Sequence, residues 1–165
     1  MKRILMAMVF ALAMGQASAE DLKIRDVFKQ MPDSLMPYLT QNNRLDFIDF
    51  LDSDMKAEVR NRFGGTSEMT SLSDDSLVIR MNESYRVDLL LLPLSEPMDS
   101  VSQVVVMIET FLVDSLYGES CVRYYSPDWN PIPQKPPFQE EQLKRIETKI
   151  MQNILKKDED LVNKP

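Results

Sequence analysis

The sequence predicts an α+β fold: short N-terminal helices, an antiparallel β-meander of four to five strands, a Pro-rich strap and a C-terminal amphipathic helix. Three observations lead to this fold class. Apolar side chains recur with a helical period in residues 22–63 and with a period of two in residues 67–125. Residues 126–138 are rich in proline, and an amphipathic helical pattern follows them. Helices and strands segregated along the chain in this way are typical of an α+β domain.

The N-terminal residues 1–19 have the pattern of a secretory signal peptide. Lys2 and Arg3 supply the positive charge, residues 4–14 form an apolar run, and residues 17–19 read Ala-Ser-Ala, an A-x-A cleavage site. Cleavage following Ala19 predicts a periplasmic or otherwise exported protein with no stable membrane insertion after the signal is removed. A retained anchor is the alternative, but it requires about 20 apolar residues, more than this run supplies.

The region after the signal peptide is expected to form a short helix and then a short or irregular segment. Ile24, Val27 and Phe28 fit one helical face. Pro32 and Pro37 restrict the length of any helix between them.

A second helix is expected to begin near Arg44 and to end at the glycines 64–65, because glycine is favoured just past a helix end. Asp46 and Asp49 are three positions apart on the side opposite the apolar stripe. They are the candidates for a weak metal site, and a solvated helix face is the plainer interpretation. Asp52 would fall on the apolar side, so it or the serine after it is expected to cap a break in the helix.

Alternation of apolar and polar residues predicts the strands of the meander. The runs are residues 77–81, 85–91, 104–108 and 121–125, and the third is apolar on both faces, as in a central strand. Turn-forming residues separate them at hairpin spacing. One face of the sheet is expected to pack on the N-terminal helices, with the other partly exposed to water.

The strap, residues 126–138, holds five prolines within eleven residues, which exclude a helix or a central strand. The segment that follows the strap is expected to be an amphipathic helix, with an apolar stripe formed by Leu143, Ile146, Ile150 and Ile154. We therefore expect one domain over residues 20–157, with a frayed tail over residues 158–165.

Composition excludes several classes of function. The chain has 19 basic and 26 acidic residues and a net charge of −7, a balance that opposes binding to nucleic acid or anionic lipid. Histidine is absent, so a Ser-His-Asp triad, a Cys-His pair and any histidine-based metal site are excluded. No cofactor is expected. Carboxylate-only catalysis, Ser-Lys chemistry and an all-oxygen cation site remain open.

The single cysteine, Cys121, cannot form an intramolecular disulfide. It lies in a predicted strand, and free cysteine is among the most buried residue types, so we expect a small buried apolar residue. A reactive thiol or an intermolecular bridge is the alternative.

Acid–serine pairs recur at the predicted turns. Gathered at one end of the sheet, their oxygens could bind Ca²⁺, whereas the plainer interpretation is that they hydrogen-bond their own backbone and stabilise turns. The pairs are Asp33-Ser34, Asp75-Ser76, Glu83-Ser84, Asp99-Ser100, Asp114-Ser115 and Glu119-Ser120.

The segment around the strap holds the candidate binding residues, Tyr124, Tyr125, Trp129 and Pro131. Aromatic side chains near an extended chain can bind peptides, glycans or partner proteins. A lone tryptophan in such a strap can instead fill the end of a core.

Three segments of the chain resemble a known family. They are MPDSLMPYLTQNNRLDFIDFLDSDMKAEV at residues 31–59, SEMTSLSDDSLVIRM at residues 67–81, and Asp128-Trp129-Asn130-Pro131. The chain resembles an exported family of unknown function from the Bacteroidales over nearly its whole mature length. The resemblance implies a Gram-negative host and a periplasmic or surface location, and it assigns no activity and no catalytic residue.

We therefore predict a non-enzymatic binding or interaction module that uses the sheet edge or the strap around Trp129. The partner would be an unknown envelope protein, a peptide or a glycan. The alternative is a carboxylate-dependent hydrolase acting on an envelope or dietary polymer. That alternative requires a deep cleft lined by at least two acidic side chains whose environments shift their pKa values in opposite directions.

Overall fold

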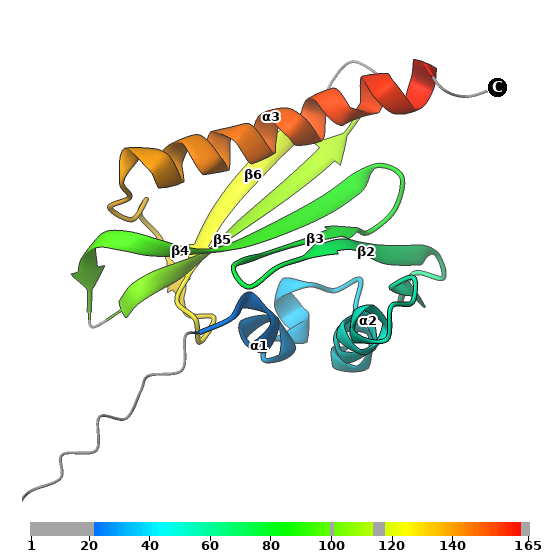
Figure 1. Ribbon diagram of the computed structural model, residues 1–165, viewed down its shortest axis with the longest axis horizontal. Helices are drawn as coiled ribbons and strands as arrows, with labels where there is room; N and C mark the ends of the chain where they lie inside the picture. Colours follow the sequence, from blue (N-terminus) through cyan, green and yellow to red (C-terminus); the bar gives the residue numbers. More distant parts are fainter. Residues whose placement is uncertain (1–21, 100, 114–117, 163–165) are drawn as a thin grey trace, which may run out of the picture.

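A computed structural model of the chain describes residues 22–99, 101–113 and 118–162. One antiparallel sheet forms its centre, with the N-terminal helices against one face and the C-terminal helix against the other (Figure 1). The helices are α1 (Ile24–Lys29), the 3-10 turn η1 (Asp33–Leu35), α2 (Gln41–Asp52) and α3 (Glu140–Val162). This arrangement confirms the predicted α+β fold class. The predicted signal peptide, with its cleavage site after Ala19, lies outside the described residues.

Each strand of the sheet is hydrogen-bonded to its neighbours along the chain, so the sheet is a continuous meander. The strands are β1 (Glu58–Arg60), β2 (Thr66–Leu72), β3 (Ser76–Arg80), β4 (Tyr85–Met98), β5 (Val101–Leu112), β6 (Gly118–Tyr125) and β7 (Pro131–Ile132). The sheet has seven strands, so the expected four to five is too low. The strands β1 and β7 have three and two residues, too few for alternation to reveal them.

The N-terminal helices form as expected up to the start of α2. Ile24, Val27 and Phe28 are buried on one side of α1, and η1 is a single short turn between the two prolines. At the start of α2, Thr40 Oγ1 accepts a hydrogen bond from the Asn43 N–H at 3.1 Å. The Thr40 N–H donates to Asn43 Oδ1 at 3.0 Å. This reciprocal capping box fixes where the helix begins.

The predicted helix end at residues 64–65 is wrong. The helix stops at Asp52, and the chain reverses at Asp54, whose φ of 55° is the left-handed conformation that follows many helix ends. Residues 58–60 then enter the sheet as β1, so Val59 is buried as a strand residue. Aspartate tolerates this conformation better than most residues, which explains why no glycine is needed there.

Asp52 also differs from its predicted role, because it does not cap a second helical segment. It is the last residue of α2, and its Oδ1 lies 2.8 Å from Nη2 of Arg25 in α1. The same carboxylate accepts a second hydrogen bond, from Arg25 Nη1 at 3.2 Å. The pair therefore joins the ends of the two helices.

The sheet separates two hydrophobic cores. Leu89 and Leu91 of β4 face the core beneath the N-terminal helices, whereas Leu90 and Leu92 face the core beneath α3. All four side chains are at most 1 % exposed. The middle of β4 is therefore buried on both faces, which explains the continuous apolar run at residues 89–92.

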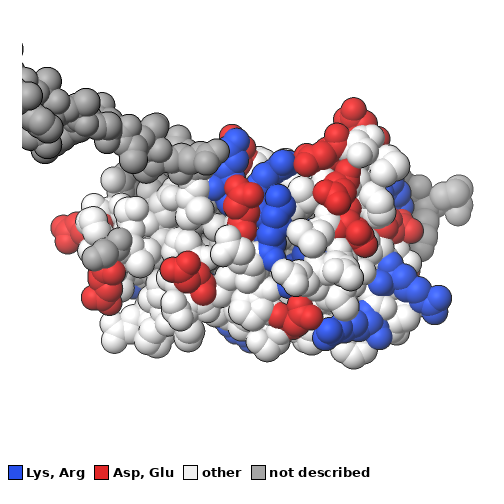
Figure 2. Space-filling model, turned by 90° about the horizontal axis from the view of Figure 1, so that it is seen from below, with Lys and Arg blue, Asp and Glu red and all other residues white. Residues whose placement is uncertain are grey.

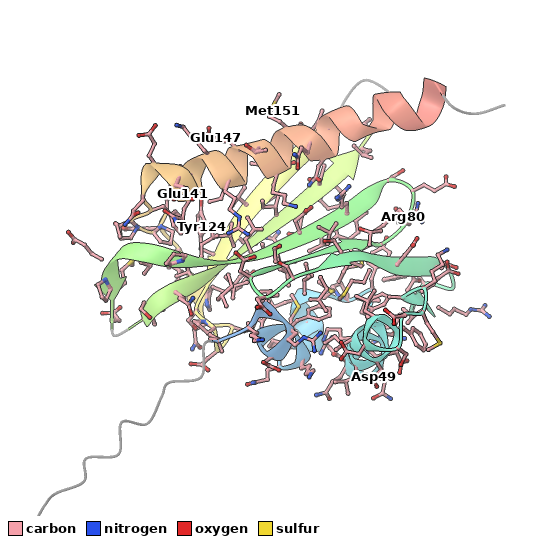
Figure 3. All side chains as sticks on the ribbon, viewed as in Figure 1. Asp49, Arg80, Tyr124, Glu141, Glu147 and Met151 are labelled. Atoms are coloured by element: carbon pink, nitrogen blue, oxygen red, sulfur yellow. The ribbon has the colours of Figure 1, made fainter. Side chains whose placement is uncertain are left out.

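The helix α3 covers the second face through part of its predicted stripe. Ile146 is buried, and Ile150 packs against the same core. In Figure 3, Glu147 and Met151 lie on the side of α3 away from the sheet, and Tyr124 lies between the helix and the sheet. The helix continues to Val162, through part of the segment expected to be a frayed tail.

Charges of both signs are interspersed on the face formed by α1 and α2 (Figure 2). Several of these charges form ion pairs at the surface. Arg62 Nη2 lies 3.0 Å from Asp33 Oδ2, and Lys29 Nζ lies 3.6 Å from Asp26 Oδ1. Opposite charges therefore partly neutralise one another on this face.

Candidate functional site

The strap begins with a tight turn that its own hydrogen bonds hold. The Ser126 N–H donates to the Asn130 carbonyl at 2.9 Å, and the Trp129 N–H donates to the Ser126 carbonyl at 2.9 Å. Ser126 Oγ accepts from the Asn130 N–H at 3.2 Å. Trp129 has a φ of 65°, a conformation that is rare for a bulky side chain. These bonds hold the backbone in that conformation.

The side chain of Trp129 points into the larger core. It is 5 % exposed, and its Nε1 donates a hydrogen bond to the Val27 carbonyl in α1 at 2.8 Å. Its ring centroid lies 5.6 Å from that of Tyr125. The residues on either side, Asp128 and Asn130, are exposed, so the turn buries an aromatic anchor and presents polar groups to solvent.

After the turn, Pro131 begins the edge strand β7 directly opposite Tyr125. The next residues outward, Ser126 and Asn130, are joined by a hydrogen bond from the Ser126 N–H to the Asn130 carbonyl. Because hydrogen-bonded and non-hydrogen-bonded pairs alternate along antiparallel strands, Tyr125 and Pro131 form a non-hydrogen-bonded pair. The position that would carry the Pro131 N–H therefore faces away from β6. This is the orientation in which an edge strand tolerates proline, so the strap can join the sheet here.

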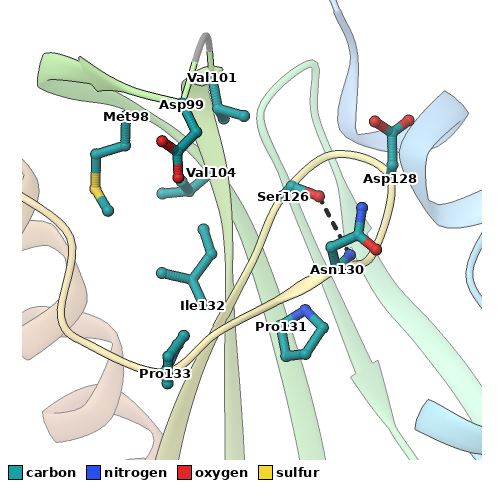
Figure 4. Close-up of a pocket in the computed structure, with 10 residues that line it drawn as sticks. All are labelled: Met98, Asp99, Val101, Val104, Ser126, Asp128, Asn130, Pro131, Ile132 and Pro133. Carbon is teal, nitrogen blue, oxygen red and sulfur yellow. Dashed lines mark hydrogen bonds between the residues drawn. The ribbon is translucent and has the colours of Figure 1, made fainter.

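The strap and the tip of the β4–β5 hairpin border a pocket of about 460 Å³ (Figure 4). This volume lies in the range of roughly 300–1,000 Å³ that small-ligand sites occupy. The hairpin contributes one wall, the strap turn contributes another, and β7 with the residue after it contributes a third. The lining residues are Met98, Asp99, Val101, Val104, Ser126, Asp128, Asn130, Pro131, Ile132 and Pro133.

The pocket combines apolar surface with negative charge. Val104 and Ile132 contribute apolar side chains to the lining, the first buried and the second half-buried. The carboxylates of Asp99 and Asp128 are exposed, and neither forms an ion pair within the part of the chain that the structure describes. None of the described residues that line the pocket is a lysine or arginine. The lining therefore suits a ligand with both an apolar portion and a positive group.

A second opening of about 480 Å³ lies between α2 and β2. Arg25 and Asp52 are among its lining residues, and they already form the bidentate pair described above. The charges in this opening are therefore satisfied within the chain. We place the candidate site at the strap pocket for this reason.

The predicted binding residues have different positions. Pro131 is exposed and lines the pocket, whereas Tyr125 and Trp129 are each 5 % exposed in the larger core. Tyr124 lies on the opposite face of the sheet, with its ring 5.9 Å from that of Phe138. The strap is therefore one side of a pocket, with Pro131 at its surface and with Tyr125 and Trp129 packed in the larger core behind it.

Sequence reasoning missed the other side of this pocket. Asp99 has a φ of 45° at the tip of the β4–β5 hairpin, as an aspartate in a tight turn often does. The sequence marks Asp99 as a turn residue, and Asp128 as part of a family motif. Nothing local shows that two acids almost thirty positions apart share a pocket, because that proximity arises from the register of β5, β6 and β7.

Asp46 and Asp49, the predicted candidates for a weak metal site, are both exposed on α2. Figure 3 shows Asp49 at the outer side of that helix. Within the described residues, no group of three or more acidic or cysteine side chains is arranged to hold a metal ion. Their positions match the solvated helix face that was the plainer interpretation.

Cys121 is exposed, so the expectation that it is a small buried residue is wrong. It points to the same face of the sheet as Glu109, its partner in β5. The N-terminal helices pack under β1 to β4, and the sheet face at Cys121 extends beyond them. Alternation in the sequence showed a strand but not which part of each face the helices cover.

A buried polar cluster lies between α3 and the sheet. Asn153 Nδ2 donates to Asp88 Oδ2 at 2.7 Å and to Thr110 Oγ1 at 3.2 Å. Burial raises the pKa of the Asp88 carboxyl, and the nearby positive charge of Arg86 opposes this effect. Asp88 is fully buried, so this carboxyl anchors α3 to the sheet and is not open to a ligand.

Among the described residues, no helix is sufficiently long and apolar to cross a membrane.

Comparisons with known proteins agree with the fold and assign no activity. A family model described as a protein of unknown function, DUF3256, matches residues 16–162, which confirms the predicted resemblance. No curated protein matches the chain. One similar solved structure is a domain of an uncharacterized protein from Porphyromonas gingivalis W83, with a TM-score of 0.55 and 21 % sequence identity. The similarity covers 77 % of this chain and 69 % of that one, and at this identity it supports the fold alone.

Proposed function

The chain belongs to the DUF3256 family of unknown function, and from that premise we propose that it is an exported, non-enzymatic binding module whose ligand enters the strap pocket. The observation that carries the proposal is the position of two carboxylates, Asp99 and Asp128, on a pocket with apolar walls, neither of them in an ion pair with another described residue. Export is supported by the signal-peptide pattern of residues 1–19.

The ligand we propose is a short peptide segment in which an arginine or lysine is next to an apolar residue. The aliphatic stem of such a cation can pack on apolar surface such as Ile132 while its head reaches a carboxylate. Charge-assisted hydrogen bonds of this kind are about twice as strong as neutral ones. The acidic lining also disfavours an acidic peptide, so the pocket discriminates by charge as well as by shape.

The strap is suited to binding because its position is fixed before a ligand arrives. Trp129 anchors it to α1 through the bond to the Val27 carbonyl, and Ser95 holds its far end by donating to the Pro137 carbonyl at 2.9 Å. A wall that is already ordered loses little conformational entropy on binding. The pocket therefore needs no large rearrangement to accept an extended segment.

The hydrolase alternative finds no specific support at this pocket. Acid–base hydrolysis uses one carboxyl whose environment keeps it protonated and a second that remains ionised. Asp99 and Asp128 are both exposed, and their environments are similar in this respect. The acid with a raised pKa, Asp88, is sealed beneath α3.

Calorimetric titration with two synthetic peptides tests the proposed function. The peptides share an apolar residue and differ only in carrying arginine or glutamate beside it. We expect the arginine peptide to bind, and the double variant Asp99→Asn/Asp128→Asn to bind it about tenfold or more weakly, since a charge-assisted hydrogen bond contributes about 1.5–3 kcal/mol.

The matched control is Asp46→Asn/Asp49→Asn, which makes the same change in charge on exposed α2 positions outside the pocket. This control should bind the arginine peptide like the unmodified protein. Equal binding of the two peptides, no binding of either, or an equal loss in both double variants would contradict the proposed function.

A further inference from the structure

Among the described residues, the strand β6 has a second strand on its outer edge only at its C-terminal end. Its inner edge is paired with β5 along residues 118–125, whereas β7 covers only Tyr124 and Tyr125 on the outer side. Within the described residues, no backbone hydrogen bond from outside the β5–β6 pair reaches Ser120 or Val122. Unpaired N–H and C=O groups along such an edge can pair with another strand.

The hydrogen-bond pattern shows which groups point outward. Because Tyr125 and Pro131 form a non-hydrogen-bonded pair, the backbone groups of Tyr125 point toward β5. By alternation, the backbone groups of Cys121 also point toward β5. Those of Ser120 and Val122 point outward, on either side of Cys121.

The residues of this edge are complementary to themselves when a second copy runs antiparallel. In a pair centred on Cys121, Ser120 of one copy faces Val122 of the other, so their outward N–H and C=O groups can exchange hydrogen bonds. Glu119 of one copy then faces Arg123 of the other, and the reverse pair forms across the two-fold axis. Opposite charges directly across a strand pair are favourable, and like charges are not.

The same charges disfavour other arrangements. A parallel, in-register pair would place Arg123 beside Arg123 and Glu119 beside Glu119. Arg123 also pairs with Glu109 in its own chain, with Nη1 and Oε2 2.6 Å apart, and Glu119 has an interaction within its chain as well. The pairs between copies would therefore extend existing interactions. Because the Arg123 side chain is 52 % exposed, it remains accessible to a second partner.

The opposite edge of the sheet is less suited to pairing. The strand β1 has only three residues, and its Arg60 carbonyl already accepts a hydrogen bond from Asn43 Nδ2 at 3.5 Å. A short edge that side chains partly satisfy is one of the devices by which proteins avoid unwanted pairing.

We propose that two copies of this chain associate through antiparallel pairing of β6 with β6, with Cys121 on the two-fold axis. The sheets of the two copies then form one continuous sheet, and the two strap pockets are related by the two-fold axis. Opposed residues of a non-hydrogen-bonded pair have Cα atoms about 4.5 Å apart, within the range that a disulfide can bridge. Cys121 is therefore a direct reporter of this interface. The proposal is independent of what the strap pocket binds.

Cross-linking of the full chain with the oxidant diamide, followed on non-reducing gels, tests the arrangement. We expect Cys121 to form a covalent dimer at least about tenfold faster than a cysteine placed at exposed Glu147 in a Cys121→Ser/Glu147→Cys protein, because only the paired edge holds two thiols together. Equal rates for the two cysteines would overturn the proposal.

Charge variants test the register. Glu119→Arg should slow Cys121 cross-linking about tenfold by placing arginine opposite arginine. Glu147→Arg is the matched control, because it makes the same charge change on the exposed side of α3. Equal rates in the Glu119→Arg and Glu147→Arg proteins would contradict this register.

A non-covalent measurement keeps the test independent of thiol chemistry. The Cys121→Ser protein should sediment as a concentration-dependent dimer, and Val122→Pro in that background should abolish the dimer by removing an outward N–H. Circular dichroism checks that the proline variant remains folded. If Val122→Pro unfolds the chain, Glu119→Arg in the same background replaces it. A Cys121→Ser protein that remains monomeric up to about 1 mM would overturn the proposal, since that corresponds to less than about 4 kcal/mol of binding.

Discussion

At the scale of single residues, Trp129 determines the shape of the strap. Its left-handed backbone is unfavourable for a bulky residue, and burial of the indole with its hydrogen bond to Val27 offsets that cost. The turn therefore depends on a contact made far away in the sequence. This dependence is why the sequence showed the possibility that the tryptophan fills a core but could not decide it.

The first stability prediction concerns this residue. Trp129→Ala should lower the free energy of unfolding by about 3–5 kcal/mol, because it removes a large buried side chain and leaves a cavity. Trp129→Phe keeps most of the volume and loses the indole hydrogen bond, so it should cost about 0.5–1.5 kcal/mol, because the Val27 carbonyl keeps its bond from the Gln30 N–H. Urea unfolding monitored by circular dichroism measures both.

Pro131→Ala is the control for the tryptophan variants, since this side chain is exposed at the same strap. Its cost should be below about 1 kcal/mol. A Trp129→Ala cost as small as that of Pro131→Ala would show that the indole does not anchor the strap.

At the scale of elements, α3 is tied to the turn between β2 and β3 by one ion pair. Arg145 Nη1 lies 2.7 Å from Asp75 Oδ2, and Arg145 lowers the pKa of that carboxyl. Both side chains are more than a third exposed, so solvent screens the pair. The contribution of this pair to stability is therefore small.

Asp75→Asn should therefore destabilise the protein by about 0.5–1 kcal/mol at pH 7. Because the folded-state pKa is depressed, the stabilisation is present above the unfolded-state pKa of about 4 and is lost as the pH falls through the folded value. The difference between Asp75→Asn and the unmodified protein in thermal unfolding should thus shrink as the pH falls below about 4. A difference that persists at acid pH would contradict the ion-pair explanation.

The elements differ in how well the sequence predicted them. Long runs such as β4 and β5 and the short α1 were clear from periodicity. The error at the end of α2 arose because Val59 and Phe63 continue a helical period, although Val59 is buried as a strand residue and Phe63 is 68 % exposed. The left-handed Asp54 that ends the helix has no distinctive sequence signal, unlike a glycine.

At the scale of the whole molecule, the two cores share one sheet. Adjacent residues of β4 face the two cores alternately, so unfolding of β4 would disrupt both cores together. The expected consequence is one cooperative unfolding transition.

Leu89→Ala and Leu90→Ala test this coupling, since they face different cores. Each should lower stability by about 2–5 kcal/mol and shift the same single transition in calorimetry. Two separate transitions, with each variant moving only one of them, would show that the layers unfold independently. Exposed Met151→Ala on α3 is the control, and its effect should stay within about 0.5 kcal/mol.

The candidate site also belongs to this scale. Pro131 was a candidate binding residue because it lies in the strap. The pocket that it lines exists because β5 brings the hairpin tip beside the strap turn. Sequence periodicity does not show which loops, far apart in the sequence, lie next to each other in the fold. The exposure of Cys121 was missed for the same reason, because it depends on where the helices stop covering the sheet.

The meander has a kinetic consequence as well as a static one. Strand pairing joins only consecutive strands, so hairpins can close one after another over short loops, and topologies rich in local contacts fold quickly. The indole bond from Trp129 to Val27 instead spans 102 positions. Loop-closure entropy therefore favours its formation last, as the event that seats the N-terminal helix against a completed sheet.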